Sequence, residues 1–312
     1  MEKYITEQHK YYTLDYYLKS RFKKKVFKVA LNGNFTCPNR DGKVGTKGCI
    51  FCSPSGSGDF AGNPNDSLEK QFQVVSSIIH EKWKDALYIV YFQANTNTYK
   101  PLPELKELFE KAISLNDKIV AISIATRPDT LPDDVVKYLG ELNRRLPVFV
   151  ELGLQTANED TALLINRGYK LDVMTDAIKR LRKENIEVIV HIINGLPFED
   201  KEDMYKTIDY LNTQDIQGIK IHSLFVLKGT ILAKMYLNNE FKVMEMRDYI
   251  EVTANQIARL KPNVVIHRIN GDAPKDLLLA PNWSEKKLVV MNEIDKYMKE
   301  HDLYQGKEYQ KK

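Results

Sequence analysis

Ala86-Leu87-Tyr88-Ile89-Val90-Tyr91-Phe92 is a nearly unbroken apolar run in this chain of 312 residues. Such a run is typical of a strand covered on both faces, as in a parallel sheet with helices outside. Similar β-rich runs lie near residues 26–31, 119–126, 148–154, 188–194 and 218–226. Helix-like stretches alternate with them, near residues 68–82, 104–115, 133–143, 172–183, 202–211 and 231–237. This alternation predicts an α/β fold, a partial (β/α)6 TIM-type barrel with a C-terminal extension.

The predicted barrel divides the chain into three parts. A tyrosine-rich and basic N-terminal segment spans residues 1–25, the barrel spans residues 26–230, and an extension spanning residues 231–312 packs on the barrel. Within the extension, residues 264–269 predict one more strand and residues 285–301 a final helix.

The cysteines of the chain are Cys37, Cys49 and Cys52, in the spacing Cys-x11-Cys-x2-Cys. Glycines around them indicate a tight loop whose backbone can approach a ligand closely. Three thiolates suit a metal or iron-sulfur site with one coordination position left open, such as a 4Fe-4S cluster with one iron without a protein ligand. The alternative is a structural zinc site with a distant fourth ligand such as His9 or His80. A disulfide framework is disfavoured because three is an odd number.

Polar side chains recur where the predicted strands end, and in a barrel such positions gather at one face. They are Gln93, Asn95, Thr96, Arg127, Glu151, Gln155, Arg167, His191 and His222. Alternation along a strand puts Glu151, Gly153 and Gln155 on one side, which can point into the barrel. Taken singly, each could instead be a hydrogen-bonded core group.

The formal net charge is +4 and the sequence pI is about 8.6, which is only mildly basic. The run from Arg21 to Lys25, with Tyr11, Tyr12, Tyr16 and Tyr17 before it, suits phosphate attraction and base stacking. It could equally be a solvated face with packed tyrosines. Apolar runs of membrane-spanning length and the apolar core of a signal peptide are absent from the sequence, so we expect a cytoplasmic protein without a membrane partner.

Several segments together resemble the radical S-adenosylmethionine (SAM) superfamily, and more narrowly its YtqA/YhcC subgroup, which is related to the catalytic subunit of elongator. They are the cysteine loop with Phe51 before its last cysteine, Thr126-Arg127-Pro128-Asp129, Glu151-Leu152-Gly153-Leu154-Gln155-Thr156, Asn166-Arg167-Gly168 and Ile193-Asn194-Gly195-Leu196-Pro197. The likeness runs from about Val26 to Ala280-Pro281-Asn282-Trp283, which is most of the chain.

The resemblance implies that Cys37, Cys49 and Cys52 hold a 4Fe-4S cluster whose fourth iron binds SAM. Reductive cleavage of SAM then gives methionine and a 5'-deoxyadenosyl radical. By motif, Arg167 resembles the arginine that pairs with the SAM carboxylate, and His191 lies where relatives contact the ribose. The Gly-Gly-Glu segment that holds the methionyl amine in other members is absent. The implied cofactor contacts are Gln93, Asn95, Arg127, Glu151, Gln155, Arg167 and His191.

For substrate, the resemblance implies the wobble uridine of tRNA, where carboxymethylaminomethyl-2-thiouridine is shortened to aminomethyl-2-thiouridine before a separate methyltransferase acts. The implied partners are tRNA, an electron donor of the flavodoxin or ferredoxin type, and that methyltransferase. Two alternatives stay open: a radical SAM enzyme acting on a small molecule, like the oxygen-independent coproporphyrinogen oxidases, and a non-catalytic, zinc-stabilised RNA-binding protein.

Overall fold

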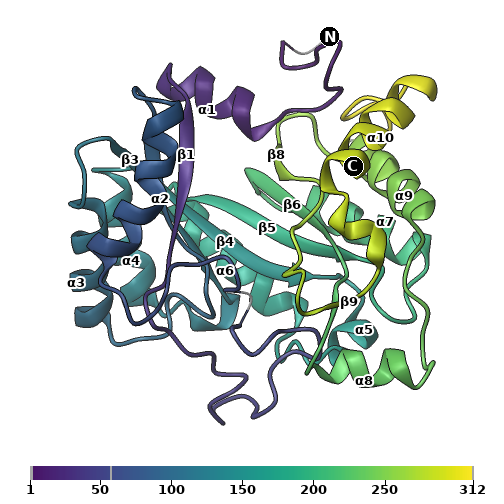
Figure 1. Ribbon diagram of the computed structural model, residues 1–312, viewed down its shortest axis with the longest axis horizontal. Coiled ribbons are helices and arrows are strands. Elements are labelled where there is room, and N and C mark those ends of the chain that lie inside the picture. The colour runs from purple at the N-terminus through teal and green to yellow at the C-terminus, as the bar shows by residue number, and fades with distance from the viewer. Residues whose placement is uncertain (1–2, 57, 311–312) are drawn as a thin grey trace.

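Seven parallel strands form the central sheet, which curls into a half-barrel in the computed structural model (Figure 1). The structure describes residues 3–56 and 58–310. In spatial order the strands are β1 (Val26–Leu31), β2 (Leu87–Phe92), β3 (Ile119–Thr126), β4 (Val148–Gln155), β5 (Glu187–Asn194), β6 (Gly218–Ser223) and β8 (Val265–Arg268). The predicted partial barrel is confirmed. Its sheet has a seventh strand, β8, because the strand predicted near residues 264–269 pairs with β6.

Helices cover the outer face of the sheet (Figure 1). They are α2 (Leu68–Lys82), α3 (Leu102–Ile113), α4 (Asp133–Asn143), α6 (Leu171–Lys183), α7 (Lys201–Asn212), α9 (Met246–Arg259) and α10 (Lys287–Glu300). The outward-facing strand residues and the apolar helix faces form one large core that includes Phe92, Ile122, Val150, Phe109 and Leu139. Helix α9 was not predicted, and it packs against both α7 and α10.

The inward-facing residues form two layers with different chemistry. At the amino ends of the strands, Val26, Ile89, Ala121, Phe149 and Ile189 form an apolar floor with Leu18 of α1 (Leu14–Phe22). Two residues further along each strand, the side chains on the same face are polar: Lys28, Tyr91, Ser123, Glu151 and His191. The barrel is therefore closed by packing at one end and polar in the middle.

The N-terminal segment lies at the amino ends of the strands, where it spans the gap between β8 and β1 (Figure 1). The amide of Ile266 in β8 donates a 2.8 Å hydrogen bond to the carbonyl of Tyr12. The Tyr17 hydroxyl donates to Glu187, which also pairs with Arg21, and Lys25 pairs with Asp15. Tyr12, Tyr17 and Arg21, for which the sequence left RNA contact and packing both open, thus tie the N-terminal segment to the barrel at the edge opposite the cysteine loop.

Smaller elements complete the carboxyl edge of the barrel. These are α5 (Glu159–Leu164), α8 (Ile231–Leu237) and a two-stranded antiparallel sheet of β7 (Val226–Leu227) and β9 (Leu278–Ala280). Within the described residues, no helix is both long and apolar enough to cross a membrane. The division of the chain at residues 25 and 230 stays a prediction.

Candidate active site

A cavity of about 330 Å³ opens at the carboxyl ends of the strands. Cys37, Cys49 and Cys52 lie in its wall. Every polar residue singled out in the sequence lines the same cavity, namely Gln93, Asn95, Thr96, Arg127, Glu151, Gln155, Arg167, His191 and His222. The structure therefore brings the predicted site together, while the individual roles of these residues in cofactor binding stay predictions.

The cysteine loop is held in shape by its own backbone and by the segment that follows α5. Gly48 has φ +70° and donates from its amide to the carbonyl of Asn39 at 2.6 Å. Nδ2 of Asn39 donates to the carbonyl of Asn166 at 2.6 Å, and Nδ2 of Asn166 donates to the carbonyl of Gly48 at 2.7 Å. This exchange of amide hydrogen bonds fixes Cys49 against the Asn166-Arg167-Gly168 motif.

Asn95 ties the other side of the cysteine loop to the end of β2. Its Nδ2 donates to the carbonyl of Phe35 at 2.9 Å, and its amide donates to the carbonyl of Gly56 at 2.9 Å. The amide of Thr96 donates to the carbonyl of Thr36 at 3.2 Å, directly before Cys37. Asn95 has φ +60°, a conformation that asparagine tolerates better than most residues. The structure thus gives Asn95 a positioning role in addition to the predicted cofactor contact.

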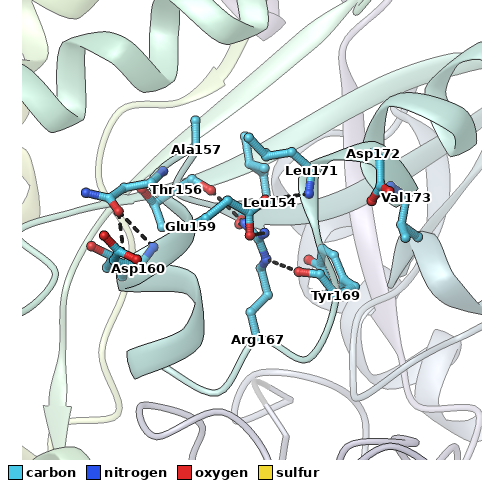
Figure 2. A network of polar contacts seen from close by, with 12 residues as sticks. Leu154, Thr156, Ala157, Glu159, Asp160, Arg167, Tyr169, Leu171, Asp172 and Val173 are labelled. Carbon is cyan, nitrogen blue, oxygen red and sulfur yellow. Dashed lines mark hydrogen bonds and ion pairs between the residues drawn. The ribbon is translucent and has the colours of Figure 1, made fainter.

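Arg167 is only 1% exposed and is surrounded by acceptors of the chain itself (Figure 2). Its Nη1 donates to the carbonyls of Leu154 and Thr156 at 3.1 and 2.7 Å, and its Nε donates to the carbonyl of Tyr169 at 3.0 Å. Its Nη2 lies 3.4 Å from Oε2 of Glu159. These contacts stabilise the turn after β4. If Arg167 also binds the SAM carboxylate, as predicted, it must do so with a guanidinium that already has partners in the chain.

Arg127 lies against the ring of Tyr169 and close enough to Cys37 and Cys49 to interact with them electrostatically. It forms a two-point ion pair with Asp129, with Nη2 at 2.7 Å from Oδ2 and Nε at 2.9 Å from Oδ1. Its Nη1 donates to the carbonyl of Arg167 at 2.9 Å. The guanidinium carbons of Arg127 and Arg167 lie 4.9 and 4.8 Å from the centre of the Tyr169 ring. Two cations therefore meet one aromatic ring beside the cysteines.

Glu151 is the centre of a buried ionic cluster inside the barrel. Its Oε1 accepts from Nζ of Lys28 at 2.5 Å and from Oγ of Ser123 at 2.7 Å. Its Oε2 lies 2.8 Å from Nε2 of His191 and also accepts from Nζ of Lys220. Burial favours the neutral acid, but Lys220 and Lys28 outweigh it and hold the pKa of Glu151 well below its usual range.

The bases around Glu151 are shifted toward their neutral forms. Burial lowers the pKa of Lys220 to about 7, although Glu151 opposes the shift. Burial also lowers the pKa of His191 to about 4 and that of His222 well below its usual range. The two imidazole rings lie 5.2 Å apart between centres. Both histidines are therefore neutral hydrogen-bonding groups at pH 7.

Gln155 and Gly153 shape the cavity wall at the end of β4. Gln155 has φ +69° at a register shift between β4 and β5, and strain of this kind is common at functional sites. A Cβ on Gly153 would lie 2.8 Å from Nε2 of Gln155, so the glycine leaves room for that amide. Sequence reasoning missed Lys220, Tyr91 and Arg268 in the lining, although Lys220 is two residues before His222 on the same strand face.

Comparison with known proteins agrees with this site. The model of the Radical SAM superfamily matches residues 40–211, more than half of the chain, and that of the Radical_SAM C-terminal domain matches residues 216–300. The chain belongs to the radical SAM superfamily. It is 49% identical to YtqA of Bacillus subtilis (strain 168) over 308 residues, which cover 99% of this chain and 95% of YtqA.

Two further comparisons place this radical SAM protein more closely. It is 34% identical to YhcC of Escherichia coli (strain K12) over 287 residues, which cover 92% of this chain and 91% of YhcC. The YtqA/YhcC subgroup is thereby confirmed. The archaeal Elp3 of Methanocaldococcus infernus with an N-terminal deletion has a TM-score of 0.65 at 19% identity, covering 90% of this chain and 64% of that one. That likeness shows a shared fold.

Membership of this superfamily implies a 4Fe-4S cluster and SAM, and the residues present fit both. All three cysteines are described, and none is in a disulfide. The pKa of the Cys49 thiol is raised, mainly by a hydrogen bond with Cys52 and to a smaller extent by burial. The hydrogen bond means that these two sulfurs are near neighbours. Nδ2 of Asn39 lies 3.7 Å from Sγ of Cys49, a donor of the kind that supports cluster sulfurs. Cys37, Cys49 and Cys52 would hold the cluster, and the open cavity beside them would hold SAM.

The zinc alternative finds no fourth ligand where it was sought. His9 contacts Asp295 through Nδ1 at 3.1 Å, in the N-terminal segment at the amino edge. His80 lies in the last turn of α2, which runs back from the carboxyl edge. In residues 3–56 and 58–310, no three His, Cys, Asp or Glu side chains are grouped to hold a single metal ion.

Proposed function

We propose that this radical SAM enzyme modifies the wobble uridine of tRNA, converting carboxymethylaminomethyl-2-thiouridine to aminomethyl-2-thiouridine. The observation that carries the proposal is the 49% identity to YtqA over almost the whole chain, together with a cavity that joins the thiol trio to a polar inner end. Bound SAM would supply a 5'-deoxyadenosyl radical on cleavage. The chain would enclose it in a half-barrel whose gap between β8 and β1 is spanned by the N-terminal segment.

Enclosure suits this chemistry because a primary carbon radical attacks whatever hydrogen donor it meets first. The apolar floor with Leu18 closes one end of the barrel. The cysteine loop borders the other, held by Asn39 and Asn95. A base turned out of the anticodon loop would enter from the carboxyl edge, as base-modifying enzymes require. The cavity would then hold the modified side group and exclude bulk water.

Exposed lysines on the cysteine loop offer phosphate contacts on the side where the RNA would enter. Lys43 and Lys47 are exposed there, and Nζ of Lys43 lies 5.3 Å from the centre of the Tyr99 ring. The basic run from Arg21 to Lys25 lies at the other edge of the barrel. We therefore assign the first phosphate contacts to Lys43 and Lys47.

The test begins with anaerobic reconstitution of the purified protein with iron and sulfide. Reduced enzyme, SAM and tRNA bearing carboxymethylaminomethyl-2-thiouridine should yield methionine, 5'-deoxyadenosine, tRNA bearing aminomethyl-2-thiouridine and glyoxylate. Loss of a hydrogen atom and one electron from the carboxymethyl carbon gives an imine that water hydrolyses to the amine and glyoxylate, and that electron replaces the one that cleaved SAM. The Cys49→Ala variant should yield neither, since two thiolates are too few to hold the cluster. Wobble nucleosides that are the same in tRNA from cells with and without the protein would refute the tRNA substrate. A small-molecule radical SAM reaction would then stand.

A further inference from the structure

When Lys220 is protonated, the buried cluster at the inner end of the cavity carries more positive than negative charge. The single carboxylate of Glu151 contacts the ammonium groups of both Lys28 and Lys220. Glu151 is 1% exposed and Lys220 is 5% exposed, so solvent does little to balance the second ammonium. Taking an unpaired charge out of water is costly. One lysine is enough to pair Glu151, so the second requires another explanation.

The two lysines differ in what they face. Lys28 contacts Oε1 of Glu151 and the ring of Tyr91, with Nζ 4.7 Å from the ring centre. Lys220 contacts Oε2 of Glu151 and donates to the Tyr91 hydroxyl at 3.1 Å. Among the described residues that line the cavity, Lys220 is present and Lys28 is not. An ammonium has three donors, so Lys220 keeps one for a ligand in the cavity.

A second polar atom at the same place also awaits a partner. Nε2 of His222 is buried and has no hydrogen-bond partner among the described residues. Buried polar atoms in native proteins are almost always paired, so an unpaired one in a cavity wall points to a ligand. His222 follows Lys220 by two residues on β6, and its ring lies beside that of His191. Lys220 and His222 therefore line the same cavity, and His191 contacts Glu151 and lies beside His222.

We propose that Lys220 and His222 bind a carboxylate group of the substrate at the inner end of the cavity, beside His191, whose N–H already goes to Glu151. The inference rests on the proposed function, in which that group is the carboxymethyl end of the modified uridine. A carboxylate supplies the missing negative charge for Lys220 and an acceptor for an imidazole N–H of His222. The site selects the substrate over its product, because the aminomethyl product lacks the anion.

The protonation of Lys220 depends on groups from every strand packed around it. These are Lys28 on β1, Tyr91 on β2, Glu151 on β4, His191 on β5, His222 on its own strand, and His267 and Arg268 on β8. A bound anion favours the charged ammonium, so binding takes up a proton when the pH is above about 7, the pKa of Lys220 without the anion. Affinity for the anion should therefore fall as the pH rises from about 6 to about 9.

The experiment uses the reconstituted holoenzyme and two kinds of probe. The first pair is acetate and its uncharged isostere acetamide, followed by ligand-observed NMR under anaerobic conditions. The second pair is tRNA bearing carboxymethylaminomethyl-2-thiouridine and tRNA bearing aminomethyl-2-thiouridine. We expect wild-type protein to prefer the carboxylate member of each pair. Lys220→Met should weaken acetate and substrate-tRNA binding roughly 10- to 100-fold, as expected for one charge-assisted hydrogen bond.

Matched variants separate contact from charge. Lys28→Met removes a cation from the same carboxylate but not from the cavity wall, so it should weaken acetate binding by no more than about threefold. Lys220→Arg should restore most of the preference for acetate. Equal losses in Lys28→Met and Lys220→Met would overturn the inference, as would acetate binding that Lys220→Met leaves unchanged. If Lys220→Met fails to fold, acetate affinity of the wild type that is constant from pH 6 to 9 would overturn it instead.

The outcomes also distinguish this inference from the proposed function. Acetate binding that depends on Lys220, without any product formed from the tRNA bearing carboxymethylaminomethyl-2-thiouridine, would keep the anion site and refute the tRNA substrate. Product formation with equal binding of the two tRNAs would overturn the assignment of the anion site to the substrate carboxylate. Product formation from tRNA, together with acetate binding that does not depend on Lys220, would support the tRNA substrate and refute the anion site. SAM also carries a carboxylate, so SAM binding is measured in parallel. A loss of SAM affinity in Lys220→Met equal to the loss of acetate affinity would assign the anion to SAM and refute the substrate assignment.

Discussion

Nη1 of Arg167 lies 2.7 Å from the carbonyl oxygen of Thr156, at the point where β4 leaves the sheet. The guanidinium also reaches the carbonyls of Leu154 and Tyr169, so one side chain satisfies three backbone acceptors (Figure 2). Backbone carbonyls that are buried without a donor cost free energy. Arg167 therefore stabilises the turn on which the cavity wall depends, whatever it contributes to cofactor binding.

Replacing Arg167 with methionine should lower the free energy of unfolding by about 3 kcal/mol, because the acceptors lose their donors. Chemical denaturation of the protein without cluster measures this. Glu159→Gln is the control, because Glu159 is half-exposed and the loss should stay below about 1 kcal/mol. If Arg167→Lys is as stable as wild type yet binds SAM weakly, the guanidinium acts on the cofactor and its structural role is minor.

Replacing Glu151 with glutamine should destabilise the protein more at low pH than at high pH. The carboxylate offsets two buried ammonium groups, and without it the pKa of Lys220 falls further below about 7. At pH 6 the variant must neutralise or bury uncompensated cations, at a cost of about 3 kcal/mol. At pH 9 Lys220 is neutral in both folded proteins, so the difference shrinks. Urea unfolding at the two pH values measures it.

Ser123→Ala provides the matched control for this pH dependence. Its hydroxyl donates to the same carboxylate at 2.7 Å but carries no charge. The expected loss is about 1 kcal/mol at both pH values. A deficit of Glu151→Gln that is equally large at pH 6 and pH 9 would contradict the ionic account and indicate a purely steric or hydrogen-bonding role.

The barrel was predictable from sequence because its strands are buried on both faces and read as apolar runs. The strand predicted over residues 26–31 is β1 to the residue. Helix α9 was missed because the polar residues Thr253 and Gln256 interrupt its apolar face, where both are fully buried. The bounds of short α5 were not predicted, because its six residues give too little periodicity.

The residues of the site were predictable where an arginine, an amide, a carboxylate or an imidazole stands in or directly after an apolar run, and not where a lysine does. Arg127 and Gln155 follow or end apolar runs, where a polar residue stands out. Lys28 and Lys220 sit in the middle of strands, where a lysine looks like a solvent-facing residue. Only the curl of the sheet shows that these positions face the interior. The hydrogen-bond partners of Arg167 and Asn95 could not be predicted from sequence, because they depend on loop conformations that bring together residues far apart in the chain.

Replacing Gly56 with alanine should reduce iron loading. A Cβ there would lie 1.8 Å from Oδ1 of Asn95, the residue that fixes the start of the cysteine loop, and Gly56 has φ +63°. Gly42 is a matched control in the same loop, since it has φ +98° but no described heavy atom within 4 Å of its Cβ position. Both changes strain the backbone by about 1 kcal/mol, but only Gly56→Ala displaces Asn95.

Iron and sulfide per chain after anaerobic reconstitution measure the effect of the two glycine variants. We expect Gly42→Ala to load as wild type and Gly56→Ala to load less than half as much, roughly the effect of displacing a residue that orients the ligands. Equal loading in both variants would show that Asn95 does not govern the position of Cys37. Equal losses would assign the effect to backbone strain instead.

The edge of the barrel that tRNA approaches can be identified from the salt dependence of tRNA binding. Replacing the lysines that contact phosphates should lower this dependence, and replacing other lysines should not. Lys43→Gln with Lys47→Gln should lower the slope of log affinity against log salt by roughly 1.4, because each phosphate contact with single-stranded RNA contributes about 0.7. Lys23, Lys24 and Lys25 lie at the amino edge, where Lys25 is paired with Asp15. Replacing all three with glutamine removes more charge, yet should leave the slope unchanged. The reverse result would mean that the RNA contacts α1, and the carboxyl edge would no longer be the entrance.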